Sequence, residues 1–537
     1  MYRRFMNATL NNLPNDIDTL KNIIKDLSYQ VDHLTKTSKE QHQTIQCLEE
    51  EKKLLLHRLF GKKSEKLTAE DILQGRLFDE AEVHIDNATD DSDAATTTVQ
   101  SHTRKKTGKK PLPADLPRVD IIHDIAEEEK HCPCGCELTK IGEEVSEKLD
   151  LVPAKIEVHR HIRYKYACKK CEGTADDGPA VKTAPMPKQM VPQGIVSHGL
   201  LAWSLVSKFC DAIPFYRQEK LFARIGVELS RATFCNWSRI AYDGCVRLLD
   251  LMWDDVLHSP LVGMDETSVQ VMNEINRKNT TKSYMWVFRG GGKQPVIMFK
   301  YNPTRSSEFV NTAFSDYAGV IQTDGYQGYN DLGSRKNVTH AACWAHVRRK
   351  FMEAMKGSGN SPVANSIVDQ IKKLYAVESE IGENKYGSDE IKKVRHEKSR
   401  PVVEAIERQL QKQVNAVAPK SLTGKAISYA LELWPRLCVF LDNPIVSIDN
   451  NPVENAIRPF VVGRKNWLFS GSPRGAHASA GIYCIIETAK ANGLEPYWYL
   501  RYLFEKLPAC IGDDEIRLLM PNRIDPHVID QYRGGVN

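Results

Sequence analysis

A seven-residue spacing of apolar side chains runs through the first sixty positions of the chain. The repeat consists of Leu20, Leu27, Leu34, Leu48 and Leu55 in one register and Ile24, Val31 and Ile45 in the other. Sustained heptads with charged flanks predict a coiled coil, which we assign to residues 15–80. Ser38 and Gln41 make its middle polar. A lone amphipathic helix is the alternative, but the heptads favour self-association into a homo-oligomer.

A polar linker follows, which we assign to residues 81–118. Residues 85–100 are acidic and too poor in apolar side chains to bury a core. A basic run precedes Pro111 and consists of Arg104, Lys105, Lys106, Lys109 and Lys110. Such a run is either a solvated tether or an arm that contacts DNA phosphates, and we include it among the candidate DNA-binding residues.

Helical periodicity returns in residues 186–255. Within it, a helix up to Ile225, a turn at Gly226 and a second helix capped by Ser230 give the outline of a helix-turn-helix. Arg231, Asn236 and Arg239 would then be available to a DNA groove. Many helical hairpins share this outline and bind nothing.

The pattern becomes extended after Pro260. Residues 261–271, 283–288 and 295–301 are rich in β-branched and aromatic side chains, and a helix from Ser306 and a strand at 320–323 follow. Three antiparallel strands, a helix and a fourth strand are the order of a ribonuclease-H-like core, which we assign to residues 256–475. The first and fourth strands are neighbours in such a sheet.

Three carboxylates are placed to meet at one edge of this sheet. Asp265 lies on the first strand, Asp324 ends the fourth, and Glu454 opens a helix that Asn450 or Asn451 can cap and Pro452 suits. Arg458 follows one turn later on the same face. Mg²⁺ takes oxygen ligands, and two such ions stabilise both the attacking and the leaving oxygen of a phosphodiester displacement. Each acid alone also has an ordinary explanation as a turn, strand-end or first-turn residue.

The cysteines of the chain predict a second metal site, separate from the carboxylates. The chain has 13 cysteines, an odd number that argues against a disulfide framework. Five of them flank an alternating segment at 155–167: Cys132, Cys134, Cys136, Cys168 and Cys171. Two such knuckles predict a zinc ribbon over residues 119–180, with Cys168, Cys171 and two of the first three cysteines as ligands.

Several of these segments together resemble the insertion sequence 66 family of bacterial transposases. They are Met-Asp-Glu-Thr at 264–267, Thr-Asp-Gly-Tyr at 323–326, Cys-Trp-Ala-His-Val-Arg-Arg-Lys-Phe at 343–351, Asp-Asn-Asn-Pro-Val-Glu-Asn-Ala-Ile-Arg-Pro at 449–459 and Gly-Arg-Lys-Asn-Trp-Leu-Phe at 463–469. Arg-Leu-Phe-Gly-Lys-Lys-Ser-Glu-Lys at 58–66 and Gly-Glu-Glu-Val-Ser-Glu at 142–147 also belong to the resemblance, which covers nearly the whole chain. It implies a DDE catalytic triad of Asp265, Asp324 and Glu454 that uses two Mg²⁺ ions, with Mn²⁺ as a substitute.

The resemblance extends to the surroundings of the triad. Residues 350–442 are charged and helical, as in the helical insertion of several DDE transposases. Cys343 and His346 are spaced like metal ligands, but two ligands do not make a zinc site, so we expect them to support the active site. The motifs also carry candidate DNA-binding residues: Arg348, Arg349, Arg458, Arg464 and Lys465. Residues 476–537 are expected to form a C-terminal helical element whose first helix packs on the catalytic sheet.

The complete prediction is a multi-domain α+β chain with a coiled coil, a zinc ribbon, a helical DNA-binding region and a ribonuclease-H-like α/β core. With no apolar stretch of membrane-spanning length and no signal peptide, we expect a cytoplasmic bacterial protein that binds transposon ends and target DNA. Accessory proteins of the same element are further expected partners. The competing functions are a nuclease that cuts without joining and a DNA-binding regulator with a decayed catalytic core; the presence of all three carboxylates counts against decay.

Overall fold

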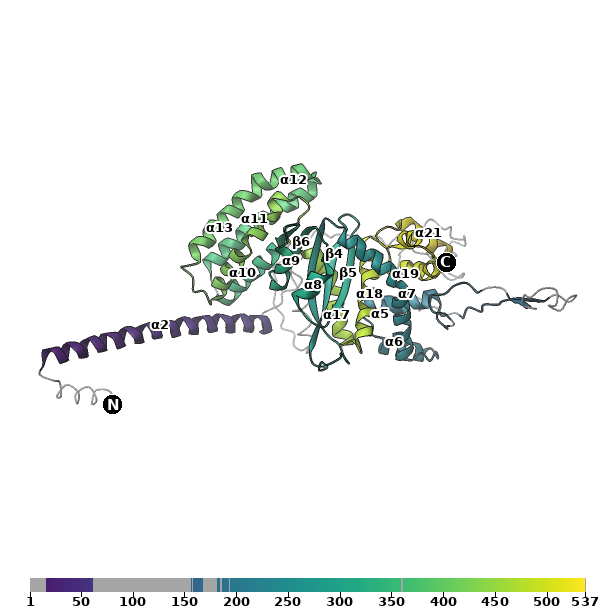
Figure 1. Ribbon diagram of the computed structural model, residues 1–537, viewed down its shortest axis with the longest axis horizontal. Helices are drawn as coiled ribbons and strands as arrows, with labels where there is room; N and C mark the ends of the chain where they lie inside the picture. The colour runs from purple at the N-terminus through teal and green to yellow at the C-terminus, as the bar shows by residue number, and fades with distance from the viewer. Residues whose placement is uncertain are drawn as a thin grey trace, which may run out of the picture. The chain divides into compact units, whose positions relative to one another are not determined.

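The computed structural model describes residues 16–60, 156, 158–167, 181–183, 186–192, 194–358 and 361–536 (Figure 1). The chain divides into two compact units, residues 1–88 with 188–537 and residues 89–187. In the second unit, β1 (Lys165–Ala167) pairs antiparallel with β2 (Val181–Thr183). The five predicted zinc ligands, the basic run at 104–110 and the acidic linker lie outside the described residues.

A five-stranded mixed sheet forms the centre of the first unit. Its strands are β3 (Leu261–Gln270), β4 (Lys282–Gly290), β5 (Val296–Asn302), β6 (Gly319–Thr323) and β7 (Val338–Ala342). They lie in the order β5-β4-β3-β6-β7, with β3–β4 and β4–β5 antiparallel and β3–β6 and β6–β7 parallel. The predicted mixed α/β fold with β3 beside β6 is therefore confirmed; β7 was not predicted.

Helices cover both faces of the sheet because successive strand side chains point to opposite sides. On one face, Phe299 contacts Phe460 of α17 (Asn451–Trp467) and Tyr483 of α18 (Pro473–Ala491). On the other, Trp286 contacts Phe309 of α8 (Ser307–Ala313), and Phe288 contacts Trp253 near the end of α7 (Arg231–Leu257). The predicted packing of the 476–492 helix on the sheet is confirmed: Thr488 bonds both backbone groups of Ile297.

A helical insertion separates β7 from α17. Its main helices are α10 (Trp344–Ser358), α11 (Pro362–Asn384), α12 (Ser388–Val394), α13 (Arg400–Gln413) and α14 (Leu422–Glu432), followed by α15 (Trp434–Leu437) and α16 (Val439–Asp442). All of these helices except α12 contribute to an apolar cluster that includes Ile371, Leu374 and Ile406. The amide of Trp344 donates to the carbonyl of Ile448 at 3.0 Å, so the two ends of the insertion meet.

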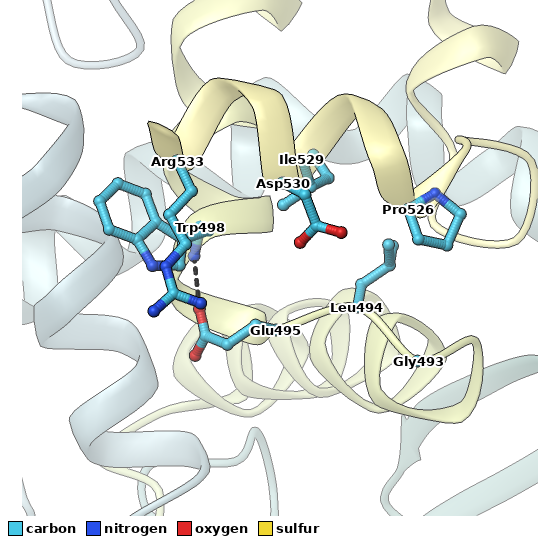
Figure 2. A pocket seen from close by; sticks show the side chains of 8 residues that line it. All are labelled: Gly493, Leu494, Glu495, Trp498, Pro526, Ile529, Asp530 and Arg533. Atoms are coloured by element: carbon cyan, nitrogen blue, oxygen red, sulfur yellow. Dashed lines mark hydrogen bonds between the residues drawn. The ribbon is translucent and has the colours of Figure 1, made fainter. Parts of the chain in front are cut away.

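Helices also flank the core near both ends of the chain. The long α2 (Ile17–Phe60) exposes most of its apolar seam and buries Leu54 near its C-terminal end, where Glu51 pairs with Lys425 of α14 at 2.5 Å. Towards the C-terminus, α19 (Pro496–Lys506), α20 (Asp513–Leu519) and α21 (Pro526–Val536) follow α18. Figure 2 shows a small pocket between the start of α19 and α21, and none of the predicted site residues lines it.

Candidate active site

The strand register brings Asp265 and Asp324 side by side. Gly263 on β3 pairs with Gln322 on the parallel β6, so the residues two positions further along, Asp265 and Asp324, lie next to each other at the end of β6. One carboxylate oxygen of Asp265 accepts the amide of Glu266 at 2.8 Å, and one of Asp324 accepts the amide of Tyr326 at 2.8 Å. The second oxygen of each carboxylate is left for another partner.

Helix α17 begins beside these two residues and carries Glu454 in its first turn. Asn450 occupies the N-cap position, but its side-chain amide donates to the carbonyl of Met264 at 3.0 Å and caps no helix amide. Val453 lies against Gly263, where any larger side chain would collide with it. The predicted capping by an asparagine side chain at 450 is therefore wrong, and Asn450 ties α17 to β3 next to Asp265.

The three carboxylates are electrostatically coupled. Burial raises the pKa of Asp265 well above its usual value, and the nearby Glu266, Asp324 and Glu454 raise it further. Burial also raises the pKa of Asp324 and of Glu454, while Arg349 lowers both. Like charges held together out of water favour protonation or a bound cation. The residues thus fit a divalent metal: they offer hard oxygen ligands, and the buried Oε1 of Glu454 has no hydrogen-bond partner.

Two of the residues predicted to support the site do lie beside Glu454. His346 on α10 places Nδ1 3.6 Å from Glu454 Oε1, and Cys343 accepts the amide of Asn450 on its sulfur at 3.2 Å. Cys343, His346 and Glu454 each offer a ligand atom within 4.8 Å of the others. Burial lowers the pKa of His346 to about 3, which keeps its imidazole neutral and able to accept a proton or bind a metal.

A partly buried network around Glu266 was not predicted from the sequence. Glu266 forms an ion pair with Arg305, whose Nε donates to it at 2.7 Å, and Tyr329 donates its hydroxyl to the second carboxylate oxygen. The Arg305 guanidinium lies 3.6 Å from the centre of the Tyr326 ring, and the Tyr326 hydroxyl donates to the Arg305 carbonyl. Because Tyr326 also bonds Asp324, the network connects the segments that carry both aspartates. The sequence signal that could have pointed to this network is the pair of adjacent acids, Asp265 and Glu266, on one strand.

Four segments of the chain match family models. Residues 193–478 match the DDE domain of the transposase IS66 family, and residues 484–521 match the IS66 C-terminal element. Residues 129–172 match the zinc-finger binding domain of transposase IS66, and residues 47–121 match the family described as transposase C of IS166 homeodomain. The chain belongs to the IS66 family of transposases.

Similar proteins occur in Sinorhizobium fredii (strain NBRC 101917 / NGR234). The uncharacterized protein y4qI is 30% identical over 554 residues, which cover 96% of this chain and 98% of the relative. The uncharacterized protein y4jD is 30% identical over 511 residues, covering 92% of this chain and 93% of the relative. The likeness therefore extends over nearly the full length of all three proteins.

The predicted DNA-binding residues of this IS66 chain differ in their surroundings. Arg349 pairs with Glu454 at 3.3 Å, and Arg464 donates to the Thr267 hydroxyl on β3 at 2.6 Å. Arg348 is only 1% exposed, so the DNA contact expected of it would require its side chain to become accessible. Helix α17 continues through Pro459 to Trp467. Arg458 and Lys465 therefore share the face of Glu454, four and eleven residues along.

The predicted helix-turn-helix is present as a structural motif. Helix α6 (Phe215–Arg224) is followed by Gly226 with a positive φ of 80°, and Ser230 caps α7 by accepting the amide of Thr233 at 3.2 Å. Arg231 and Asn236 are exposed at the start of α7, whereas Arg239 pairs with Asp243 at 2.7 Å. The second helix continues into the core of the catalytic domain, since Trp253 near its end packs on Phe288. Among the described residues, no helix has the length and apolar character needed to span a membrane.

Proposed function

We propose that the chain cleaves DNA at the ends of an insertion sequence and transfers the resulting 3′-hydroxyl ends to target DNA, with Asp265, Asp324 and Glu454 as catalytic residues. One observation carries the proposal: the β3–β6 register and the start of α17 bring three partly buried carboxylates from distant parts of the chain to one edge of the sheet. A site of this kind suits chemistry at a phosphodiester.

The three carboxylates would hold two Mg²⁺ ions, or Mn²⁺ in their place. Such ions, when bound, activate the attacking hydroxyl group and stabilise the leaving oxygen. The residues around them have supporting roles. Arg349 and Lys350 on α10 lower the pKa of Asp324 and provide positive charge for the phosphate being cut. Arg458 and Lys465 on α17 extend this positive charge along the DNA backbone.

The remaining modules bind DNA and join chains. We propose a structural zinc ion on Cys168, Cys171 and two of Cys132, Cys134 and Cys136, and DNA contacts from the basic run at 104–110 and from Arg231 and Asn236. We further propose that α2 assembles chains into a homo-oligomer. We expect the protein to act inside a bacterial cell, on the DNA of the element and together with accessory proteins of the same element.

Amide substitution of the triad tests the function. Asp265→Asn, Asp324→Asn and Glu454→Gln each remove a metal-binding charge while keeping the side-chain size, so each should abolish both cleavage and joining, by at least about 10³-fold. Purified protein is incubated with linear DNA that carries the ends of the element and Mg²⁺, and cut and joined products are separated on a denaturing gel. Binding of the ends should survive, because other residues supply it.

Matched amide substitutions at exposed acids are the control. Glu308 lies at the start of α8 and Asp316 follows that helix, and both are exposed. Glu308→Gln and Asp316→Asn should retain the wild-type rate. Near-normal joining by Glu454→Gln would show that another residue is the third ligand. Cut but never joined products from the wild type would favour a nuclease.

A further inference from the structure

The helix that carries Glu454 ends in a strained turn. After Trp467, Leu468 adopts φ 67° and ψ −50°, and the amide of Phe469 donates to the carbonyl of Trp467 at 2.9 Å. This is a γ-turn with positive φ, a rare and strained conformation for a residue with a side chain. Strain of this kind persists where surrounding contacts enforce it, and it concentrates at functional sites.

Contacts on the next residues hold this turn in place. The amide of Ser470 donates to the carbonyl of Gln270 at 3.0 Å, and the amide of Met272 donates to the carbonyl of Ser470 at 2.9 Å. The side chain of Asn273 donates to the carbonyl of Gly471 at 3.1 Å. The turn is thereby fixed to the far end of β3, the same strand that carries Asp265.

The fixed turn presents apolar side chains to solvent. Leu468 is 66% exposed and Phe469 is 46% exposed, and Ile275 on the neighbouring β3–β4 connection is 87% exposed. We call Leu468 and Phe469 the apolar turn. Exposing two adjacent large apolar side chains on a strained, anchored backbone costs stability, so a partner that covers them is expected.

Each of the three segments next to the apolar turn carries a cation. Lys465 lies in the last turn of α17, Arg474 in the first turn of α18, and Lys278 on the β3–β4 connection. A partner that fits must therefore combine negative charge with flat apolar surfaces. Nucleic acid does so: its phosphates pair with the cations, and an unstacked base offers an apolar face to an aromatic ring or an aliphatic wedge.

The apolar turn lies at a defined distance from the carboxylates. Leu468 follows Glu454 by fourteen residues of continuous helix, which is about 21 Å along the axis of α17. Gln270 follows Asp265 by five strand residues, or about 17 Å. At about 3.4 Å per nucleotide, a DNA strand leaving the catalytic site along α17 reaches the apolar turn after five or six nucleotides.

We propose that Leu468 and Phe469 insert into the DNA held by the catalytic core and stack on an unpaired base five or six nucleotides from the bond that is cut. The proposal rests on the proposed function, because DNA must lie along α17. The strained backbone keeps both side chains extended before DNA binds, so the protein loses little side-chain freedom when they insert.

The test uses 2-aminopurine, a base analogue whose fluorescence rises when it is unstacked. The full-length chain is mixed with duplexes that carry one element end. Each duplex has 2-aminopurine at a single position, three to nine nucleotides from the cleavage point. Ca²⁺ replaces Mg²⁺ to prevent cleavage. Binding is followed by anisotropy of a distant dye. The wild type should raise 2-aminopurine fluorescence several-fold at position five or six, Phe469→Ala should lose the rise, and Phe469→Leu, which keeps a large apolar side chain, should retain most of it.

Two controls separate this proposal from the catalytic one. Ile511→Ala removes another exposed apolar side chain, 90% exposed, near α20 and should leave the signal unchanged. Asp324→Asn should keep the signal while losing cleavage; an Asp324→Asn protein that still cuts would overturn the catalytic assignment alone. A rise that survives Phe469→Ala, or its absence at all positions with DNA bound, would overturn the wedge. The wedge would also be overturned if Phe469→Ala lost self-association of the chain but left the fluorescence unchanged, because the turn would then contact another protein chain.

Discussion

Glu266 holds together the segments that carry Asp265 and Asp324. Its side chain is 2% exposed and bonds Arg305 and Tyr329. Glu266→Gln keeps an acceptor for Tyr329 but leaves Arg305 without its ion pair. Because Arg305 is 40% exposed, solvent screens the lost charge, and we expect a stability loss of only about 1 kcal/mol. Cleavage should fall by about tenfold or more as Tyr326 and Asp324 shift, measured as the rate on element ends.

The loss of cleavage expected for Glu266→Gln differs from what the position of Glu266 in the sequence alone suggests. As neighbours of triad residues, Glu266 and Asp449 would be expected to tolerate amide substitution well. Both are instead largely buried, and Asp449 accepts the amide of Asn451 at 3.1 Å at the start of α17. Glu308→Gln is the suitable comparison. Equal cleavage rates in Glu266→Gln and Glu308→Gln would contradict the positioning role of the network.

His340 gives the core a predictable response to acid. It lies buried on β7, its Nε2 is 2.8 Å from the Thr323 hydroxyl, and burial lowers its pKa from 6.5 to about 3. The unfolded chain therefore binds a proton at a pH where the folded chain does not. Stability from this residue is complete above about pH 6.5 and is lost as the pH falls towards 3.

At pH 5 the loss from His340 should be about 2 kcal/mol relative to pH 7. His340→Gln should be less stable at pH 7 but lose less on acidification, measured as the urea midpoint at both pH values. His346, whose pKa is also about 3, keeps part of the acid sensitivity in the variant. An identical shift of the midpoint in wild type and variant would show that His340 is protonated in the folded protein.

At the scale of elements, replacing leucine by glycine should have opposite effects on stability at the end of α17 and within α20. Glycine adopts positive φ without strain, so Leu468→Gly should stabilise the chain by up to about 1 kcal/mol. Leu518 is 72% exposed within α20, where glycine costs helix stability, so Leu518→Gly should destabilise by about 1 kcal/mol. Thermal unfolding of both variants measures this difference. Destabilisation of similar size in both would mean that Leu468 makes contacts that offset its strain.

The elements that the sequence predicts well are those with a strong local pattern. Strands β3 to β6 have apolar β-branched runs, and α7 has its Ser230 cap, so periodicity and capping suffice. Strand β7 is five residues long like β6, but it leads almost directly into α10, which leaves too little extended pattern to detect it. Asn450 also misleads, because a tertiary bond to Met264 competes with local capping. Local rules fail where a distant partner offers the better bond.

The candidate site shows the same division. The three carboxylates were identifiable because motifs and strand order point to them. The contacts of Glu266 with Arg305 and of His346 with Glu454 join residues 39 and 108 positions apart. No spacing rule reaches so far, and only the folded sheet and α10 bring these side chains together. The burial of Arg348 likewise depends on the packing of the insertion.

At the scale of the whole molecule, α2 predicts how chains assemble. Leu27 and Leu34 belong to the same heptad register and are exposed in the single chain. Leu27→Glu with Leu34→Glu should place like charges in the seam and reduce the mass measured by light scattering to that of one chain. The control, Lys36→Glu with Lys39→Glu, changes exposed residues outside the two apolar registers and should leave the mass unchanged. An oligomer that survives the leucine substitutions must be held by another surface.

The insertion between β7 and α17 also delays the synthesis of Glu454 relative to that of Asp265 and Asp324. Asp265 and Asp324 emerge early, but Glu454 follows Asp324 by 130 residues, which takes about 6 to 26 s at ordinary rates of synthesis. The hydrogen bond between Trp344 and Ile448 closes only after the whole insertion has been made. A nascent chain therefore carries two of the three acids without the third. On the proposed function, a chain at this stage of synthesis therefore lacks the complete set of acids that cleavage would require.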